Sequence, residues 1–465
     1  MKKVLIVALV VFGIVTAASA TLVTNMNQSA LYVRLLSRNA STDVDAVYYN
    51  PAGLVVLKDG WHIGLNNQTV FQTKTIANEF PFLNTHSYDG KVNVPFFPDI
   101  YAVYKKNKLA FSFGVGPSAG GGTADFQKGL PSFEWQFAAL PALISGMGIP
   151  TTKYSTDIAF KGSSIYLGFQ FNVSYALSDS ISAALGARYV SAKNTYTGHI
   201  NNVMVNPTQP LLGLTGAMIP ATTFFNTMKA YYTSLGNATG AAMMGAYAAS
   251  MADKAVDAEQ TASGITPLVS LNFKPTAGLN IAVKYEFGTK LEFTNKTAKD
   301  DVDMFPDGAK SRSDVPAFLS VGAAYEIMPE LRATASFNYF FDKNTNWEGR
   351  ENFVNSNSYD IALGVEYDVS QSLVLSAGYL ITQFDLASGY QSDMAHDMGA
   401  NTFGGGARIK ISPMFDIDLG IMLPSYKSDQ KMIPYITSTG INLGTYQERY
   451  SRTTTAFAVA LNFHL

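Results

Sequence analysis

Two segments of the chain place an apolar side chain on nearly every second residue. One spans 165–175. The other runs from Ile281 to Leu291 and Phe293, and the residues between its apolar positions include the charged Lys284, Glu286, Lys290 and Glu292. A β-strand turns successive side chains to opposite faces, so each segment has one apolar face and one polar face. A water-soluble sandwich would bury the apolar face, whereas a transmembrane barrel turns it to lipid and keeps the charges in its lumen.

The beginning of the chain indicates export. Lys2 and Lys3 precede an apolar stretch over 4–15, and Ala18-Ser19-Ala20 resembles a cleavage site, so residues 1–20 are predicted to be a secretory signal peptide. The apolar stretch is shorter than the roughly 20 residues that a spanning helix needs. The 465 residues include no cysteine, so an exported chain of this size must be stabilised by something other than disulfides, such as a closed hydrogen-bonded sheet.

The rest of the chain alternates between strand-like segments and connections of two lengths. Short connections such as 105–107 and 177–179 alternate with long ones, notably those near 118–160 and 197–264, which is the asymmetry of periplasmic turns and outer loops. We count about fourteen strands, an even number as single-chain bacterial barrels require. They lie near 61–73, 93–105, 108–117, 161–176, 180–196, 265–274, 280–294, 315–326, 330–343, 356–367, 372–384, 401–412, 415–427 and 452–465.

These patterns predict an all-β protein: a transmembrane antiparallel β-barrel over 61–465 in the outer membrane of a Gram-negative cell, with partly helical extracellular loops. Residues 21–60 do not alternate, and we expect them to form a folded plug or a helical preface rather than wall. Lipid and the barrel-insertion machinery are the expected partners, and we expect a monomer. The net charge of −2 gives no bulk basic balance, so the composition does not indicate nucleic-acid binding.

The N-terminal block contains Asn27-Gln28-Ser29-Ala30, Asn39-Ala40, the stretch 43–48 and above all Asn50-Pro51-Ala52-Gly53-Leu54. With these motifs it resembles the FadL/TodX family of outer-membrane transport proteins, which take up long-chain fatty acids and other hydrophobic compounds. It implies that residues 21–60 form a hatch, or plug, inside the lumen and that Asn50, Pro51 and Ala52 belong to it. It also implies capture of a hydrophobic ligand among the outer loops, transfer to a pocket inside the barrel, and lateral release into the membrane past an inward kink in the third strand.

Two features match parts of this mechanism. Gly114, Gly116 and Pro117 end the third strand, and because proline cannot donate to a ladder and glycine allows bulges, they are the candidate kink; an ordinary strand end is the alternative. Two outer loops are unusually apolar, which favours a capture groove, although long loops also need a core of their own. Their candidate ligand-binding residues are Trp135, Phe137, Leu140, Phe224, Phe225, Met228 and Tyr231.

Inward cations offer a carboxylate anchor. Arg188 is the ligand-binding candidate, because an arginine fork matches a carboxylate, and Lys284, Arg332 and Arg408 also point inward by alternation. Each has nearby lumen acids with which it could pair instead. A hairpin around Ser412-Pro413 sets two such pairs opposite one another across the strands: Lys410 with Asp416 and Arg408 with Asp418.

The sequence predicts no enzyme. Its five histidines are scattered, without metal-ligand spacing, and it has no cysteine, nucleophile elbow or P-loop, so no catalytic residue, metal or cofactor is expected. Two functions remain open at this point. One is passive uptake of a hydrophobic small molecule, either a long-chain fatty acid or an aromatic hydrocarbon. The other is a structural or adhesive barrel that binds another surface through its long loops.

Overall fold

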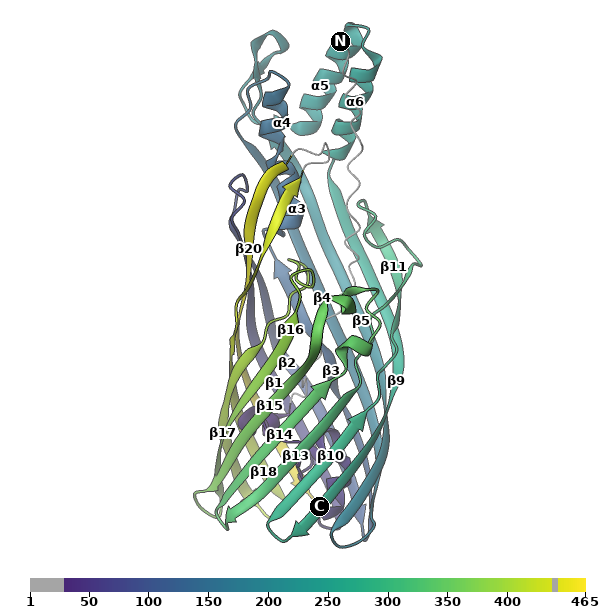
Figure 1. The fold of residues 1–465 in the computed structure, drawn as a ribbon, viewed down its shortest axis with the longest axis vertical. Helices are drawn as coiled ribbons and strands as arrows, with labels where there is room; N and C mark the ends of the chain where they lie inside the picture. The colour runs from purple at the N-terminus through teal and green to yellow at the C-terminus, as the bar shows by residue number, and fades with distance from the viewer. Residues whose placement is uncertain (1–28, 437–441) are drawn as a thin grey trace.

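The computed structural model describes residues 29–436 and 442–465, so the predicted signal peptide lies outside the described residues. The molecule is a tall barrel of tilted strands with short turns at one end, the turn end, and long loops with helices at the other, the loop end (Figure 1). Each wall strand pairs antiparallel with the next, and β1 pairs with β20, which closes the sheet. Closure leaves no wall strand at an open edge of the sheet, as a structure in lipid requires.

The described residues form a 14-strand wall, as the alternation predicts. Three wall strands are interrupted and continue as β11 (Glu292–Asp300), β12 (Lys310–Arg312) and β19 (Asp429–Ile436). The wall strands are β1 (Gly60–Asn78), β2 (Ser87–Lys106), β3 (Leu109–Phe126), β4 (Tyr154–Ala176), β5 (Ile181–Val205), β9 (Lys254–Thr276), β10 (Leu279–Glu286), β13 (Phe318–Met328), β14 (Leu331–Phe340), β15 (Val354–Asp368), β16 (Leu373–Leu386), β17 (Ala400–Ser412), β18 (Phe415–Tyr426) and β20 (Asn442–His464).

The loop end carries the remaining elements. The helices α5 (Ala221–Ser234) and α6 (Ala238–Ser250) pack together and project beyond the wall (Figure 1). The loop end also carries α3 (Pro131–Ala138), α4 (Leu140–Gly146) and the short elements β6 (Thr208–Gln209), η2 (Pro210–Leu212), β7 (Leu214–Thr215) and β8 (Ile219–Pro220). Two further short helices, η3 (Asp342–Asn344) and η4 (Arg350–Phe353), pack against β15. Among the described residues, no helix is both long and apolar enough to cross a membrane.

The outer face of the wall carries an apolar band. In β4 the exposed side chains run from Ile165 to Tyr175, which is about 33 Å along a strand at ~3.3 Å per residue and about 25 Å in height at the tilt of such barrels. This is the height of a bilayer-facing band. Toward the loop end the chemistry of the two faces is exchanged. The outward Lys161 is charged and exposed, whereas the inward Phe160 and Ile158 are apolar and buried. The strands therefore continue past the band with an apolar interior, which is why β4 and β5 extend beyond their predicted limits.

Four residues of the segment that opened the sequence argument face the opposite way to the prediction. Leu291 and Phe293 are buried inside the barrel, and Lys290 and Glu292 are exposed. The strand predicted over 280–294 stops at Glu286 and resumes at Glu292, and the intervening irregular residues reverse the phase of the alternation. Lys284 and Glu286, before the break, point inward as predicted. The predicted register of Lys410 with Asp416 and of Arg408 with Asp418 is also confirmed.

An N-terminal hatch lies inside the barrel, as predicted. It consists of α1 (Ala30–Leu35), α2 (Ala46–Tyr49) and η1 (Pro51–Val56). Every residue of α1 is buried, since the helix is surrounded by wall strands from β15 round to β1. Wall glycines make room for it: at Gly378 a Cβ would collide with the Leu35 carbonyl oxygen, and at Gly404 it would lie 2.6 Å from the Val33 carbonyl oxygen.

Candidate functional site

The hatch divides the lumen into two chambers. The chamber toward the loop end, the loop-side chamber, has a volume of about 250 Å³ and reaches down to Tyr32 of α1. Its wall mixes apolar with polar side chains, and it carries two cations, Lys74 and Arg452. Its lining also includes Gln68, Val70, Val92, Val94, Phe97, Gly120, Gly121, Gly122, Asp360, Leu380, Asp397, Met398, Met422 and Tyr426.

The chamber toward the turn end, the turn-side chamber, is strongly polar. It has a volume of about 370 Å³, and its lining includes arginines of the hatch and charged residues of the wall. Arg34 of α1 borders the turn-side chamber and is almost fully buried. Its Nη1 lies 2.6 Å from Glu366 Oε1, and its Nε lies 2.9 Å from Asp418 Oδ1. A second connection joins Arg408 of the wall to Asp43 of the hatch, at 3.2 Å. These ion pairs fasten the hatch to the wall.

The wall is interrupted beside the loop-side chamber, between β2 and β3. Pairing of these strands runs as far as Ile100 opposite Val115 and resumes only at Lys91 opposite Asp125. Within the described strands, residues 92–99 and 116–124 have no register partners in each other. We call this interruption the wall gap. Because its margins include Phe97 and 120–122, which also line the loop-side chamber, the wall gap adjoins that chamber.

Local chemistry accounts for the wall gap. Pro95 and Pro98 on β2 and Pro117 on β3 have no N–H to donate to a ladder. On β3 the register with β4 also shifts on both sides of Ala119, and Gly120 has a φ of +93°, which side-chain-bearing residues rarely adopt. Of the predicted kink residues, Gly116 and Pro117 begin the gap, whereas Gly114 lies in the paired part of the strand, opposite Tyr101.

The predicted hatch motif is held against the wall by polar bonds. Asn50 Nδ2 donates to the Ser41 carbonyl oxygen at 2.9 Å and to Asn272 Oδ1 of β9 at 2.7 Å. The Pro51 carbonyl oxygen accepts from Ser174, and the Ala52 carbonyl oxygen accepts from Ser182. The motif thus supplies backbone acceptors to inward hydroxyls of β4 and β5, where lipid-facing side chains alternate with these polar ones.

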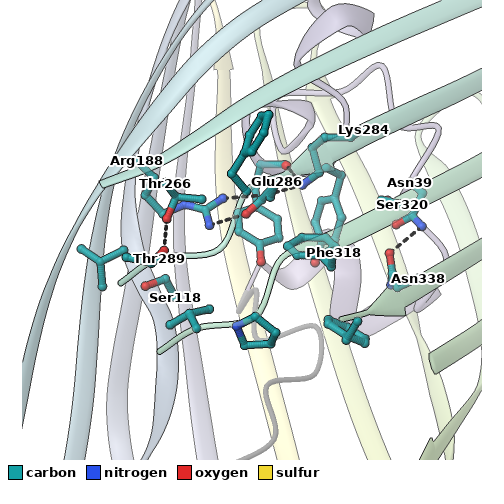
Figure 2. Close-up of a pocket in the computed structure, with 17 residues that line it drawn as sticks. Asn39, Ser118, Arg188, Thr266, Lys284, Glu286, Thr289, Phe318, Ser320 and Asn338 are labelled. Carbon is teal, nitrogen blue, oxygen red and sulfur yellow. Dashed lines mark hydrogen bonds and ion pairs between the residues drawn. The ribbon is translucent and has the colours of Figure 1, made fainter. Parts of the chain in front are cut away.

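Arg188 lies below the loop-side chamber in a buried cluster around a small cavity of about 20 Å³ (Figure 2). Its guanidinium donates to both Glu286 carboxylate oxygens, at 2.7 and 2.9 Å, and to Gln170 Oε1. Lys284 reaches the same carboxylate at 2.6 Å (Figure 2), and both cations lie over the ring of Tyr48 in the hatch. The fork of Arg188 is therefore used by protein partners, and its ligand-binding role stays a prediction.

The apolar loop residues come together at the loop end. Phe137 and Leu140 belong to the same buried cluster as Phe224, Phe225 and Met228, although the two groups lie more than 80 residues apart in the sequence. Trp135 packs against this cluster and lies 5.7 Å, between ring centroids, from Tyr435, whereas Tyr231 is exposed. In this structure the loops pack on each other, and a capture role for these residues stays a prediction.

Sequence reasoning missed Lys74 and Arg452. A signal was present, since Arg452 shares the even-numbered, inward phase of Ala456, Ala458 and Ala460. Lys74 lies one residue beyond the predicted end of the first strand, at the place where the alternation fades. Among the described residues, no group of three or more histidine, cysteine or acidic side chains is arranged to hold a metal ion.

No protein-family model and no curated protein sequence matches the chain. Solved structures do. A FadL homologue from Pseudomonas aeruginosa aligns with 96% of this chain and 99% of its own, at 12% identity and a TM-score of 0.65. The P. putida toluene transporter TodX aligns with 91% of this chain and 95% of its own, at 13% identity and a TM-score of 0.56. The Ralstonia pickettii toluene transporter TbuX aligns with 90% and 94%, at 15% identity and a TM-score of 0.50. The chain therefore has the transmembrane barrel fold of the FadL homologue and TodX.

Proposed function

We propose that this protein is an outer-membrane transporter for passive uptake of hydrophobic small molecules. The molecule is captured at the loop end, occupies the loop-side chamber, and leaves sideways through the wall gap into the membrane. The observation that carries the proposal is the interruption between β2 and β3 beside this chamber. The names of the structural neighbours agree with the proposal, since TodX and TbuX are toluene transporters.

Transfer energies favour the lateral route. Each buried CH₂ contributes about 0.8 kcal/mol on leaving water for an apolar environment, so a hydrophobic molecule is stabilised by entering lipid directly. The alternative route through the hatch breaks the Arg34 ion pairs and crosses the charged turn-side chamber. On that route an apolar molecule gains no comparable free energy of transfer from water to an apolar environment.

Capture at the loop end is the least constrained step. The buried loop cluster at the loop end includes Phe137 and Phe224, and Trp135 packs against it. We propose that a ligand reaches the loop-side chamber by displacing part of this cluster. The displaced side chains then pack against the apolar ligand instead of against each other.

A reversible disulfide across the wall gap tests the lateral route. Val94 and Gly122 face each other there, because a Cβ on Gly122 would lie 3.1 Å from a Val94 methyl carbon. The chain has no native cysteine, so the double variant V94C/G122C carries only the engineered pair. Oxidation is expected to block uptake of a fluorescent hydrophobic probe into vesicles, and reduction to restore it.

The matched control places the disulfide between the same two strands where they are already paired. Ala102 and Phe113 are register partners, so the double variant A102C/F113C links β2 to β3 without crossing the gap. Its uptake is expected to be the same before and after oxidation. If oxidised V94C/G122C transports like the reduced protein, the lateral route is wrong.

A further inference from the structure

We propose that the outer surface of the barrel binds the phosphate head group of a membrane lipid between Lys193, Lys290 and Arg312. These three cations line a depression of about 630 Å³ in the wall, where β5, β9 and β11 meet and where Glu292 supplies the one lining carboxylate. We call it the outer depression. Its charged and hydroxyl side chains point away from the lumen, so the inference goes beyond the uptake function and does not depend on it.

The outer depression lies at the edge of the apolar band. Tyr189 of β5 and Ile265 of β9 are register partners, and both are exposed. The next outward pair toward the loop end is Ser191 with Ser263, and both line the depression. The surface therefore changes from apolar to polar within two residues, as expected where acyl chains give way to head groups. Because the long loops of such barrels face outside the cell, this is the level of the outer leaflet.

The break in the wall at 287–291 accounts for the depression. Residues 262–267 of β9 have no register partner in the described strands β10 and β11. The main chain instead crosses β9 closely, since a Cβ on Gly264 would lie 2.5 Å from the Lys290 carbonyl oxygen. The change of phase that turns Leu291 inward thus leaves the Lys290 side chain exposed on the outer face. On β11 and β9 side by side, the site is on the flank where β11 rises (Figure 1).

The three cations keep hydrogen-bond donors for a ligand. Among the described residues, Lys290 forms no ion pair within 4.0 Å. Lys193 has one, to Glu259 at 2.6 Å, whereas an ammonium has three donors. Arg312 binds Asp314 through Nε and Nη2, and its Nη1 has no partner in the described part of the chain. The depression therefore presents free donors from three positive charges.

A lipid phosphate fits these donors. Guanidinium and ammonium groups are the usual phosphate ligands of proteins, and the hydroxyls of Ser191 and Ser263 can donate further bonds. The carboxylate of Glu292 is already engaged by Lys310, at 2.7 Å. The position favours a lipid over free phosphate, because acyl chains attached to the head group would lie along the exposed Ile265 and its apolar neighbours directly below.

Two lipids with the same acyl chains test the inference. Dioleoyl phosphatidic acid and dioleoylglycerol differ only in the phosphate, and their binding to the purified protein in non-ionic detergent is titrated by native mass spectrometry. Each Lys or Arg near an anionic lipid surface contributes roughly fivefold in affinity. The wild type is therefore expected to bind phosphatidic acid on the order of 100-fold tighter than dioleoylglycerol. The triple variant K193Q/K290Q/R312Q should lose most of this preference. K290Q, which breaks no ion pair, should lower it roughly fivefold.

The control variant removes three exposed cations of the loop end that lie outside the wall strands. K128Q/K153Q/K229Q lowers the net charge equally and should keep the preference. A wild type without the preference, or a preference unchanged in the triple variant of the depression, overturns the site. Excess inorganic phosphate at matched ionic strength should leave the lipid bound, and displacement by it would overturn the assignment of a lipid. Heat-modified migration on a gel shows that each variant is folded.

Discussion

Replacing Arg34 with alanine should weaken the attachment of the hatch to the barrel wall. Arg34 is almost fully buried and contacts two carboxylates, Glu366 and Asp418. Breaking a buried ion pair by removing one partner costs about 3–5 kcal/mol, because the remaining charge loses its counter-charge. Here we expect about 3 kcal/mol, the lower end of that range. Glu366 borders the turn-side chamber, where water can hydrate it, and Asp418 keeps Arg408 at 2.9 Å.

The loss of the Arg34 ion pairs should appear as an increase in ion conductance. At about 1.4 kcal/mol per tenfold change in an equilibrium constant, R34A should populate the displaced hatch roughly 100-fold more often than the wild type. In planar bilayers the wild type should show rare or no openings, and R34A frequent ones. R34K, which keeps one charge but loses the fork, should fall between them. K310A, which removes an exposed cation at the loop end, should behave as the wild type. An R34A protein that conducts and unfolds like the wild type would refute this account of the hatch.

Three further outcomes are expected. N50A removes three buried hydrogen bonds of the Asn50 side chain, two of them to the wall, and should lower the free energy of unfolding by about 1–3 kcal/mol; an unchanged denaturant midpoint would contradict this. G378A drives a Cβ into the Leu35 carbonyl oxygen, whereas G405A meets only an ordinary contact at 3.6 Å, so G378A alone should destabilise the protein, by about 1–3 kcal/mol in a melting experiment. Burial raises the pKa of Asp342, in η3 outside the wall strands, to about 6. Protonation therefore favours the native loop at low pH, stability is lost as the pH rises from about 4 through 6, and hydrogen exchange at 342–358 should quicken over that range in the wild type but not in D342N.

The wall could be predicted from the sequence because lipid imposes a simple rule on it. Each residue of the band faces lipid or lumen, so alternation alone locates the strands and gives the pairing of Arg408 with Asp418. The rule holds only inside the band. At 287–291 the backbone leaves the strand, the phase reverses, and Leu291 turns inward. No periodic pattern of apolar residues in the sequence marks this reversal of the inward and outward positions.

The candidate site was harder to predict because it depends on contacts between distant segments. The glycines and Pro117 of the third strand indicated where β3 becomes irregular, but the wall gap also runs along Pro95 and Pro98 of β2, and only the pairing of the two strands shows this. Arg188 has the right chemistry for an anchor, yet Glu286 lies close enough to engage it. Lys74 and Arg452 face each other only because β1 and β20 close the barrel. Nearly 380 residues separate them in the chain.

Simultaneous measurement of ion current and probe transfer tests the central claim most directly. The wild-type protein is placed in a bilayer, a hydrophobic fluorescent probe is added on one side, and its arrival in the membrane is followed together with the current. A route through the wall gap predicts transfer of the probe into the bilayer without a steady ion current, because the hatch stays closed. A steady current that rises and falls with probe transfer would show that cargo passes through the lumen, and would contradict the account.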